Sequence, residues 1–462
     1  MAKIFEKLLA SQISDYFETN NLFFQGQHGF RKGHSCESAL HELISDINTA
    51  RDHKYSSLLL FIDFKKAFDT VNSNLLILKL FHYGFDNHSI GLITDYFKER
   101  SQSTKLGNVI SQSDNINLGV PQGSILGPLF FLIFINDLVY ILKNVRSKLF
   151  ADDTTIYSSD ENMDVLIKNF SNNLKPLFVW CNRNQIDLNM SKTFCMFITD
   201  KRIKTPDHIF LNESKILSVK SFKLLGITLD NKLNFMEHIN NVCVTINQKL
   251  FAIKRIFYLN NAVKIQFFKS FIIPYFDYCM SLSIYFNKQT IQKICNKYYF
   301  CLYKLFNIDA STYESLNDLN NHLEIRFNFS TLQHRIFKRF SFLTFKYLNF
   351  NYGPVLLKKI LVDNFLSLSL NNMIPSLDNI KVLRSKVIIL YLETKLTKHL
   401  QNTFAHVSNL LIKSIGLESF DLDFNLFKSK LNTNLLEFYN NFLDSFNKFN
   451  IVYKNFSWSL NL

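Results

Sequence analysis

The sequence predicts an α+β fold in its first half and a mainly helical second half. In the first half, short β-favouring runs bounded by Gly, Pro and Asn are mixed with helical stretches. In the second half, Phe, Leu, Ile and Lys recur at spacings of three and four residues, which is the period of amphipathic helices. Ten of the twelve glycines lie at or before Gly226, so few tight turns are expected after it. We therefore place the main boundary near residue 230.

Length and composition narrow the class of protein. A chain of 462 residues that is 47% hydrophobic is too apolar to be disordered, and at roughly 150 residues per domain its length predicts about three structural units. Its longest unbroken apolar stretch, near Leu129 to Ile135, is much shorter than the ~20 residues that span a bilayer, so no transmembrane segment is expected. The charged start, MAKIFEKLLASQ, is unlike a secretion signal. The seven Cys form no CxxC pair and no Cys/His cluster, as expected of free thiols in a reducing, intracellular compartment.

Charge is distributed unevenly along the chain. Residues 1–230 carry 25 basic and 24 acidic side chains, whereas residues 231–462 carry 27 and 14. The net charge of +14 is therefore concentrated in the second half. A concentration of positive charge of this kind indicates a nucleic-acid partner, and a solvated helical face is the alternative interpretation.

Three carboxylates follow apolar runs in the first half. The run SLLLFID reads as a strand buried on both faces that ends in Asp63. The segment KLFADDTTIYSS is expected to form a strand, a two-residue turn of Asp152 and Asp153, and a second strand. Adjacent carboxylates repel each other, and divalent cations with oxygen ligands relieve that repulsion, although most Asp-Asp pairs are simply solvated turns. If the strands are neighbours, the three Asp converge and would hold two Mg²⁺ ions.

A rigid loop and an apolar helix lie between these carboxylates. Residues 117–138, NLGVPQGSILGPLFFLIFINDL, contain five Gly and Pro within ten positions, which predicts a loop of special backbone shape feeding a helix. The loop presents the polar side chain of Gln122, which would lie against a base pair.

Three further segments offer weaker signals. Lys192 lies between a loop and an apolar strand in QIDLNMSKTFCMFI, and residues 221–235 read as a β-hairpin that contains Gly226. Upstream, GQHGFRKGHSCESAL places Arg31 and Lys32 in a glycine-rich turn, where cations and free amides suit phosphate.

Taken together and in order, these segments resemble the reverse transcriptases of non-LTR (LINE-type) retrotransposons. The matching blocks are QHGFRKG, FIDFKKAFDTVN, GVPQGSILGPLFFLIFINDL, FADD, LNMSKT and FKLLGITLDNKLNF, which cover roughly residues 3–240. The resemblance implies a right-hand polymerase fold. Partial fingers and a palm with an antiparallel sheet would occupy 1–230, a helical thumb 231–350, and a mainly helical C-terminal region of unknown role 351–462.

The resemblance also implies a reaction and its metal ligands. Asp63, Asp152 and Asp153 would be the catalytic carboxylates that bind two Mg²⁺ ions, or Mn²⁺ in their place, for RNA-directed DNA synthesis from a primer 3′-OH. Gly226 would lie in the hairpin that grips the primer end. The expected partners are an RNA template, a DNA primer, their RNA:DNA hybrid and dNTPs, with no membrane and an undetermined oligomeric state.

Five other residues match positions of the family that contact the nucleotide. Phe68 would lie under the incoming sugar and exclude a ribose 2′-OH, with a core Phe at the start of the next helix as the alternative. Gln122 and Gly123 would line the nucleotide pocket, and Arg31 would contact the triphosphate. Lys192 would donate a proton to the departing pyrophosphate, and a solvated surface lysine is its alternative.

The resemblance leaves other functions open. The family's chains begin well upstream of this start, so we expect part of the fingers to be missing and an N-terminally truncated enzyme. One alternative is an intron maturase-like reverse transcriptase, and another is an inactive or repurposed remnant that only binds nucleic acid. The intact set of Asp63, Asp152, Asp153, Gln122 and Lys192 favours an enzyme. The family's way of life implies a nuclear location.

Overall fold

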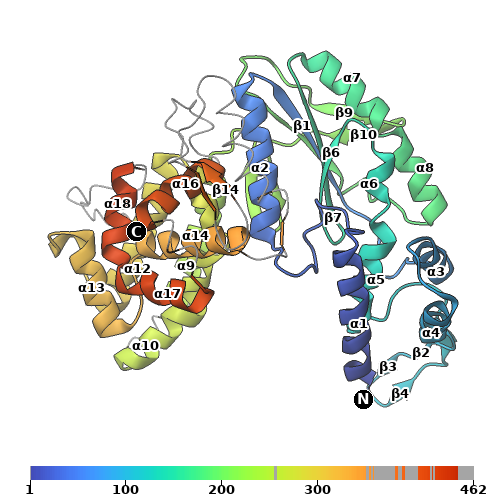
Figure 1. Cartoon of the computed structure of the whole chain (residues 1–462), viewed down its shortest axis with the longest axis horizontal. Helices are drawn as coiled ribbons and strands as arrows, with labels where there is room; N and C mark the ends of the chain where they lie inside the picture. Colours follow the sequence, from blue (N-terminus) through green and yellow to red (C-terminus); the bar gives the residue numbers. More distant parts are fainter. Residues whose placement is uncertain are drawn as a thin grey trace. The chain divides into compact units, whose positions relative to one another are not determined.

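The computed structural model of the chain describes residues 2–253, 258–349, 353–354, 357, 380–382, 388–390, 404–416, 419 and 422–445 (Figure 1). Contacts divide the chain into two compact units, Met1–Ala39 with His53–Lys220, and Leu40–Asp52 with Ser221–Leu462. The division falls shortly before the predicted boundary at residue 230, so the hairpin that contains Gly226 belongs to the second unit. The three predicted domain ranges remain predictions.

The first unit mixes helices with short strands, as the spacing of its apolar residues predicted. Its elements are α1 (Ala2–Thr19), β1 (Ser56–Ile62), α3 (Ser73–His82), α4 (Asn87–Phe97), β2 (Ser101–Gln102), β3 (Lys105–Leu106), β4 (Val109–Ile110), β5 (Asp114–Asn115), α5 (Leu126–Ile135), α6 (Leu138–Ile141), β6 (Arg146–Phe150), β7 (Asp153–Asp160), α7 (Met163–Asn173), α8 (Lys175–Asn184), β8 (Phe194–Ile198), β9 (His208–Leu211) and β10 (Ser214–Leu217).

A four-stranded antiparallel sheet organises this unit. Its strand order is β6-β7-β1-β8, so β1 is an interior strand with a partner on each side. Every residue of β1 is buried, which confirms the prediction from its continuous apolar run. Helix α7 packs on β1 and β7. The antiparallel sheet expected of the palm is therefore present.

Helix α5 forms the centre of the hydrophobic core of this unit. Nine of its ten residues are buried, and Pro128 is the exception. Proline is well tolerated there because the first turn of a helix needs no N–H donor from it. Helices α1 and α3 both pack against α5. Residues 126–135 are apolar on every face of the helix, and a helix of this kind is expected to be buried in the core.

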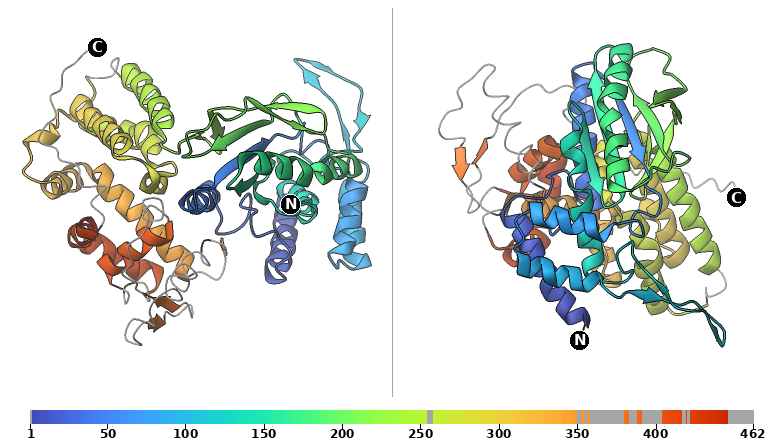
Figure 2. Two further views of the ribbon diagram at one scale, coloured as in Figure 1. Left: turned by 90° about the horizontal axis from the view of Figure 1, so that it is seen from above. Right: turned by 90° about the vertical axis from the view of Figure 1, so that its right-hand side faces the viewer.

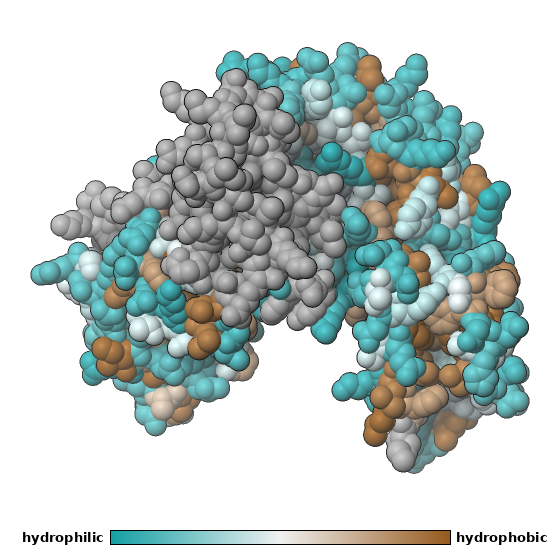
Figure 3. Space-filling model, in the orientation of Figure 1, coloured by the Kyte–Doolittle hydropathy of each residue, from teal (hydrophilic) through white to brown (hydrophobic). Residues whose placement is uncertain are grey.

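One part of the first unit projects away from its core. Strand β2 pairs with β5 and β3 pairs with β4, and Figure 2 shows this paired segment extending beyond the helices of the unit. Leu106, Val109 and Ile110 in this segment are 82%, 72% and 63% exposed. Ile4 and Leu8 of α1 are also exposed, and Figure 3 shows hydrophobic patches at the end of the unit where α1 begins.

The second unit is mainly helical in its described residues, as predicted. Its elements are most of α2 (Cys36–Asp52), β11 (Ser221–Leu224), β12 (Ile227–Asp230), α9 (Met236–Ile253), α10 (Asn261–Phe267), the π-helical turn η2 (Phe268–Ile272), α11 (Ile273–Asp277), the 3₁₀ turn η3 (Met280–Tyr285), α12 (Lys288–Phe306), the 3₁₀ turn η4 (Ala310–Thr312), α13 (Leu316–Phe327), α14 (Leu332–Asn349), β13 (Ile380–Val382), β14 (Ile388–Leu390), α16 (Phe404–Ile415), α17 (Phe424–Thr433) and α18 (Leu435–Ser445).

Aromatic side chains form much of the core of the second unit. The Phe268 ring lies 5.0 to 5.8 Å, centroid to centroid, from the rings of Phe329, Phe306 and Tyr298. Helix α14 packs against α16, α17 and α18, so the described part of the predicted C-terminal region is largely helical and shares this core. The rest of 351–462 lies outside the described residues, apart from the short antiparallel pair β13–β14.

Helix α2 joins the second unit through buried hydrogen bonds. The two ring nitrogens of His41 lie 2.6 Å from the Ser281 hydroxyl and 3.0 Å from the Tyr285 hydroxyl, and Ser45 contacts Tyr285 as well. Because all of these groups are buried, this part of α2 is an integral element of the helical unit. Among the described residues, no helix is both long and apolar enough to cross a membrane.

Candidate active site

The three predicted carboxylates lie at one end of the central sheet. Asp63 directly follows β1, and Asp153 is the first residue of β7. In the antiparallel β1–β7 pair, Ile62 is opposite Thr154, so the next position along β1 places Asp63 beside the start of β7. Asp152 lies in the turn that precedes β7. The sheet therefore brings Asp63 together with the adjacent pair Asp152 and Asp153, which follows about 90 positions later in the sequence.

The turn between β6 and β7 differs from the prediction by one residue. Phe150 pairs with Asp153, so the two-residue turn consists of Ala151 and Asp152, and Asp153 already belongs to the strand. The predicted Asp152–Asp153 turn is wrong in this respect. The cause is Ala151, which adopts the left-handed backbone conformation at φ 56° and thereby closes the turn one position earlier.

The glycine-rich segment 26–29 holds this turn in place. The side-chain carbonyl of Gln27 accepts hydrogen bonds from the Gly29 N–H at 2.8 Å and the Ala151 N–H at 3.2 Å. A Cβ on Gly29 would lie 2.3 Å from the Ala151 nitrogen, so no larger residue fits there. Gln27 is buried and supports the position of Asp152, although the sequence drew attention only to its cationic neighbours.

The three carboxylates interact electrostatically. Burial is the largest cause that raises the pKa of Asp152, and the charge of Asp63 adds to it. The pKa of Asp153 is also raised, first by desolvation and then by the charges of Asp152 and Asp63, although the residue as a whole is exposed. A concentration of negative charge of this kind is unfavourable in the protein alone and favourable beside a cation.

Asn189 fixes the orientation of Asp63. Its side-chain amide donates to Asp63 Oδ2 at 2.7 Å, and its backbone N–H donates to the Asp63 carbonyl oxygen, also at 2.7 Å. The Ser191 hydroxyl in turn donates to Asn189 Oδ1 at 2.7 Å. The sequence had directed attention to Lys192 in the same LNMSKT block, and Asn189 was missed because an Asn in a polar loop carries no distinctive signal.

The donor set fits a hard divalent cation. Mg²⁺ prefers carboxylate oxygens, and Asp63, Asp152 and Asp153 supply them on adjacent backbone positions of one sheet end. Among the described residues, no group of three or more His, Cys, Asp or Glu side chains is gathered tightly around a point that would hold a metal ion. The fit therefore rests on the chemistry of the donors and on their shared negative charge.

Phe68 lies beyond Asp63 in a turn, not at the start of a helix, and α3 begins only at Ser73. Its ring stacks on the buried Phe131 of α5, with centroids 4.5 Å apart and planes inclined by 30°. Its carbonyl oxygen accepts a hydrogen bond from the Val120 N–H at 3.0 Å. Phe68 is partly buried and packs against the hydrophobic core of this unit.

The loop of residues 117–123 is held against the turn after Asp63. Gly119 has φ 80°, and a Cβ there would lie 2.8 Å from the backbone of Asp69. The Gln122 side-chain amide donates to Asp69 Oδ1 at 3.0 Å, and Gln122 and Gly123 are exposed. The special backbone shape inferred from the glycines is therefore the shape that brings Gln122 next to the segment 63–69.

The remaining predicted residues differ in their surroundings. Lys192 is exposed, four positions after Leu188, which bridges to the residue that follows Asp63. Arg31 is largely buried in a two-point ion pair with Glu18, in which Nε donates at 2.9 Å and Nη2 at 2.7 Å. A phosphate contact by Arg31 would have to compete with that pair, and the prediction that it binds the triphosphate remains untested.

Gly226 lies in the second unit, in the turn of the β11–β12 hairpin. It has φ 82°, and a Cβ would lie 3.0 Å from the ring of Tyr278. The Tyr278 hydroxyl donates to the carbonyl oxygen of the neighbouring Leu225 at 2.6 Å. The hairpin predicted from the sequence is therefore present, and its turn packs on an aromatic ring.

Comparison with protein families and characterised chains finds similarity over the first half of the chain. The family model described as "Reverse transcriptase (RNA-dependent DNA polymerase)" matches residues 1–229. In Drosophila melanogaster, the "Probable RNA-directed DNA polymerase from transposon X-element" is 31% identical over 257 residues, which are 54% of this chain and 28% of that protein. The corresponding protein of transposon BS is 32% identical over 247 residues, which are 52% of this chain and 27% of that protein.

Other matches have lower sequence identity. The RNA-directed DNA polymerase of the mobile element jockey of Drosophila melanogaster is 24% identical over 64% of this chain and 33% of its own length. The chain thus spans about a third or less of these relatives. Among solved structures, apo telomerase of Candida tropicalis gives a TM-score of 0.37 at 11% identity, over 79% of this chain and 59% of that chain. Candida albicans telomerase in complex with a telomeric RNA fragment gives a TM-score of 0.32 at 13% identity, over 72% of this chain and 56% of that chain.

Proposed function

We propose that this chain, whose residues 1–229 are a reverse transcriptase domain with relatives in non-LTR retrotransposons, synthesises DNA on an RNA template. The observation that carries the proposal is the convergence of Asp63, Asp152 and Asp153 at one end of the central sheet. Carboxylates arranged in this way are used where a phosphoryl group is transferred between two oxygens. The substrates would be an RNA template, a DNA primer and dNTPs.

Asp63, Asp152 and Asp153 would hold two Mg²⁺ ions, or Mn²⁺ in their place. Bound there, the metal would neutralise the phosphate charge and favour the ionised primer 3′-OH. The protein side chains would supply positioning. Asn189 would keep Asp63 in one orientation, and Gln27 would keep the Asp152 turn in place.

Other side chains would select the nucleotide. The ring of Phe68, fixed on Phe131, would leave no room for a ribose 2′-OH, and Gln122, held by Asp69, would lie beside the base pair with Gly123. Arg31 would contact the triphosphate, and Lys192 would serve as proton donor to the departing pyrophosphate. These roles are part of the proposal and follow the positions that the family motifs occupy in this sequence.

The basic half would hold the RNA:DNA hybrid. Residues 231–462 carry 27 basic and 14 acidic side chains, and such an excess binds phosphate backbones with an affinity that falls steeply as salt rises. Gly226 would lie in the hairpin at the primer end. Copying for insertion into chromosomal DNA implies action in the nucleus, which imaging of the tagged chain would test.

Primer extension by the purified full chain on poly(rA)/oligo(dT) with Mg²⁺ is the decisive experiment. Wild type should extend the primer, and Asp152→Ala should not, while both should bind the hybrid with the same salt dependence. Asp164→Ala removes an exposed carboxylate of α7 and provides the charge-matched control, which should extend normally. Wild-type extension by Asp152→Ala would refute the assignment.

Hybrid binding and splicing assays separate the alternative functions. Hybrid binding without extension by the wild-type chain would indicate a nucleic-acid-binding remnant. An intron maturase-like enzyme is supported by a shorter match, a yeast "Putative COX1/OXI3 intron 2 protein" that is 31% identical over 125 residues, 27% of this chain. Splicing assays with an intron RNA would separate that function from the retrotransposon type.

A further inference from the structure

A row of aromatic side chains lies along three consecutive helical segments of the second unit. Helices α10 and α11 are joined by the π-helical turn η2, so the chain is helical from Asn261 to Asp277. An aromatic residue recurs there every three or four positions, and we call this row the aromatic stripe: Phe267, Phe271, Tyr275 and Tyr278. Three of its members are exposed, Phe271 by 52%, Tyr275 by 38% and Tyr278 by 48%.

The π-helical turn keeps these rings on one side of the helix. In a regular α-helix, residues four apart drift about 40° around the axis at each step. Because η2 turns the chain by less per residue, it offsets that drift in the middle of the row. The rings of Phe267 and Phe271 lie 5.2 Å apart, centroid to centroid, with planes inclined by 31°. The result is a continuous aromatic surface about four rings long.

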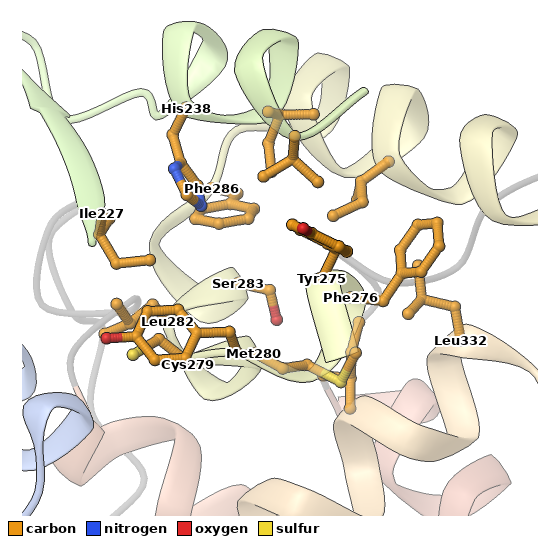
Figure 4. A pocket seen from close by; sticks show the side chains of 15 residues that line it. Ile227, His238, Tyr275, Phe276, Cys279, Met280, Leu282, Ser283, Phe286 and Leu332 are labelled. Atoms are coloured by element: carbon orange, nitrogen blue, oxygen red, sulfur yellow. The ribbon is translucent and has the colours of Figure 1, made fainter. Parts of the chain in front are cut away.

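Packing on the inner side holds two of the rings in place. Tyr275 borders a pocket together with His238 and Phe286 (Figure 4). The space in this pocket is about 20 Å³, enough for about one water, so a larger ligand has access only to the outer surface of the stripe. The Tyr278 hydroxyl donates to the Leu225 carbonyl oxygen at 2.6 Å. Rings fixed in this way lose little conformational entropy when a ligand binds.

The sequence around the stripe is basic. Residues 238–276 contain five Lys and Arg and neither Asp nor Glu. Lys264 lies three positions before Phe267, which places it next to the stripe on the helix surface. Asp277, at the end of the helical stretch, forms an ion pair with Arg335. Exposed aromatic rings among cations suit a ligand that is both anionic and aromatic, which is the chemistry of a nucleic-acid strand.

The stripe suits unpaired bases. In a duplex, neighbouring base pairs cover the faces of each base, so a row of protein rings can stack only on bases of a single strand. In the function proposed above, the RNA template is single-stranded before it is copied, whereas the DNA is paired as it is made. The choice of RNA over DNA as the occupant rests on that proposed function.

We propose that the aromatic stripe binds single-stranded RNA, with bases stacked on its exposed rings and backbone phosphates held by the surrounding basic side chains. From Phe267 to Tyr278 the row is roughly 16 Å long, which accommodates about three or four bases. The row ends at the β11–β12 hairpin, to which Tyr278 is hydrogen-bonded. A strand on the stripe would therefore pass the turn that contains Gly226.

Binding of labelled oligo(U) to the purified full chain, measured by fluorescence anisotropy, tests the site. Phe271→Ala should weaken oligo(U) binding about tenfold, the value of one stacked base, and leave binding of an RNA duplex unchanged. Phe271→Trp should keep the affinity, and oligo(U) should quench the fluorescence of the new indole because it stacks on a base. Lys264→Ala should lower the slope of log affinity against log salt by about 0.7, whereas Phe271→Ala should not change it.

The matched control is Phe210→Ala, because Phe210 is an equally exposed phenylalanine, 57%, on β9 of the first unit. This variant should bind oligo(U) as wild type does. Equal oligo(U) binding by wild type and Phe271→Ala, or an equal loss of duplex binding in Phe271→Ala, would overturn the site. Equally tight binding of oligo(dT) would overturn the choice of RNA. A dimer that Phe271→Ala dissociates would instead assign the stripe to a second copy of the chain.

Primer extension by the same preparations separates this inference from the proposed function. In an active chain, Phe271→Ala should raise the KM for a single-stranded template and leave kcat unchanged. A wild-type chain that binds oligo(U) through Phe271 and extends no primer would keep the site and lose the function. Extension by wild type with RNA binding that does not depend on Phe271 would refute the site alone.

Discussion

The hydrogen bond from Asn189 to Asp63 offers the sharpest test of how the carboxylate site is built. In Asn189→Ala, the Nδ2 donor 2.7 Å from Asp63 Oδ2 is lost. The backbone hydrogen bond from Asn189 to the Asp63 carbonyl oxygen remains, as does the bond from the Thr193 hydroxyl to the Asn189 carbonyl oxygen. The substitution therefore frees the carboxylate and leaves the loop attached to the sheet.

The size of the effect follows from the kind of hydrogen bond. A bond between a neutral donor and a charged acceptor contributes about 1.5–3 kcal/mol, which corresponds to roughly 10- to 150-fold. Asp63 and Asn189 are only half-buried, so water replaces part of the interaction and the low end applies. We expect kcat/KM for primer extension to fall about tenfold, and the Mg²⁺ concentration for half-maximal rate to rise because Asp63 is no longer held in one orientation.

The assay is primer extension across a Mg²⁺ titration, together with direct measurement of Mn²⁺ binding. The matched control is Ser191→Ala, which removes only the hydroxyl that donates to Asn189 Oδ1. This variant should lower kcat/KM for primer extension by less than about threefold. Thermal unfolding should shift by no more than a few degrees in either variant. An Asn189→Ala enzyme with the wild-type rate and metal dependence would show that Asp63 needs no support from this loop.

Three other predictions concern stability, sugar selection and the hairpin. Burial and a neighbouring carboxylate raise the pKa of Asp152 in the folded state, so without metal the contribution of Asp152 to stability falls as pH rises from acid to neutral. In urea unfolding at neutral pH, Asp152→Asn should therefore be more stable than wild type. The difference in stability should shrink toward about pH 3. Phe68→Val should raise ribonucleotide incorporation at least severalfold in single-nucleotide extension, and an unchanged sugar preference would assign Phe68 to the core only. Gly226→Ala should lower the free energy of unfolding by about 1–2 kcal/mol, because residue 226 has a left-handed backbone conformation. It should also lower primer extension, because the added Cβ would crowd the ring of Tyr278. Gly107→Ala, at φ 60° with open space around it, should show the stability loss without the loss of extension.

Much of the architecture could be predicted from local patterns. The continuous apolar run before Asp63 identified a strand buried on both faces, and the Gly and Pro positions before residue 126 identified a special loop and the helix it feeds. These features follow from short-range physics, since burial on two sides excludes polar residues and positive φ favours glycine. The helical second half followed in the same way from its three- and four-residue spacing.

The contacts that support the site could not be predicted in this way. Asn189 and Gln27 act through partners that are distant in sequence, and single polar residues in loops carry no periodicity. The turn before Asp153 closed one residue earlier than expected because Ala151 adopts a conformation that alanine rarely takes. Such details depend on contacts between residues that are distant in the sequence, and these contacts produce no local pattern in a single sequence.

The place of α2 has a consequence for how the chain is made. His41 leaves the ribosome early, but its hydrogen-bond partner Ser281 follows 240 residues later. At about 5–20 residues per second, the amphipathic segment 40–52 waits roughly 10–50 s before its permanent neighbours exist. The helical unit therefore cannot be expressed alone as one continuous segment, because residues 40–52, which belong to it, precede β1 and Asp63 in the sequence.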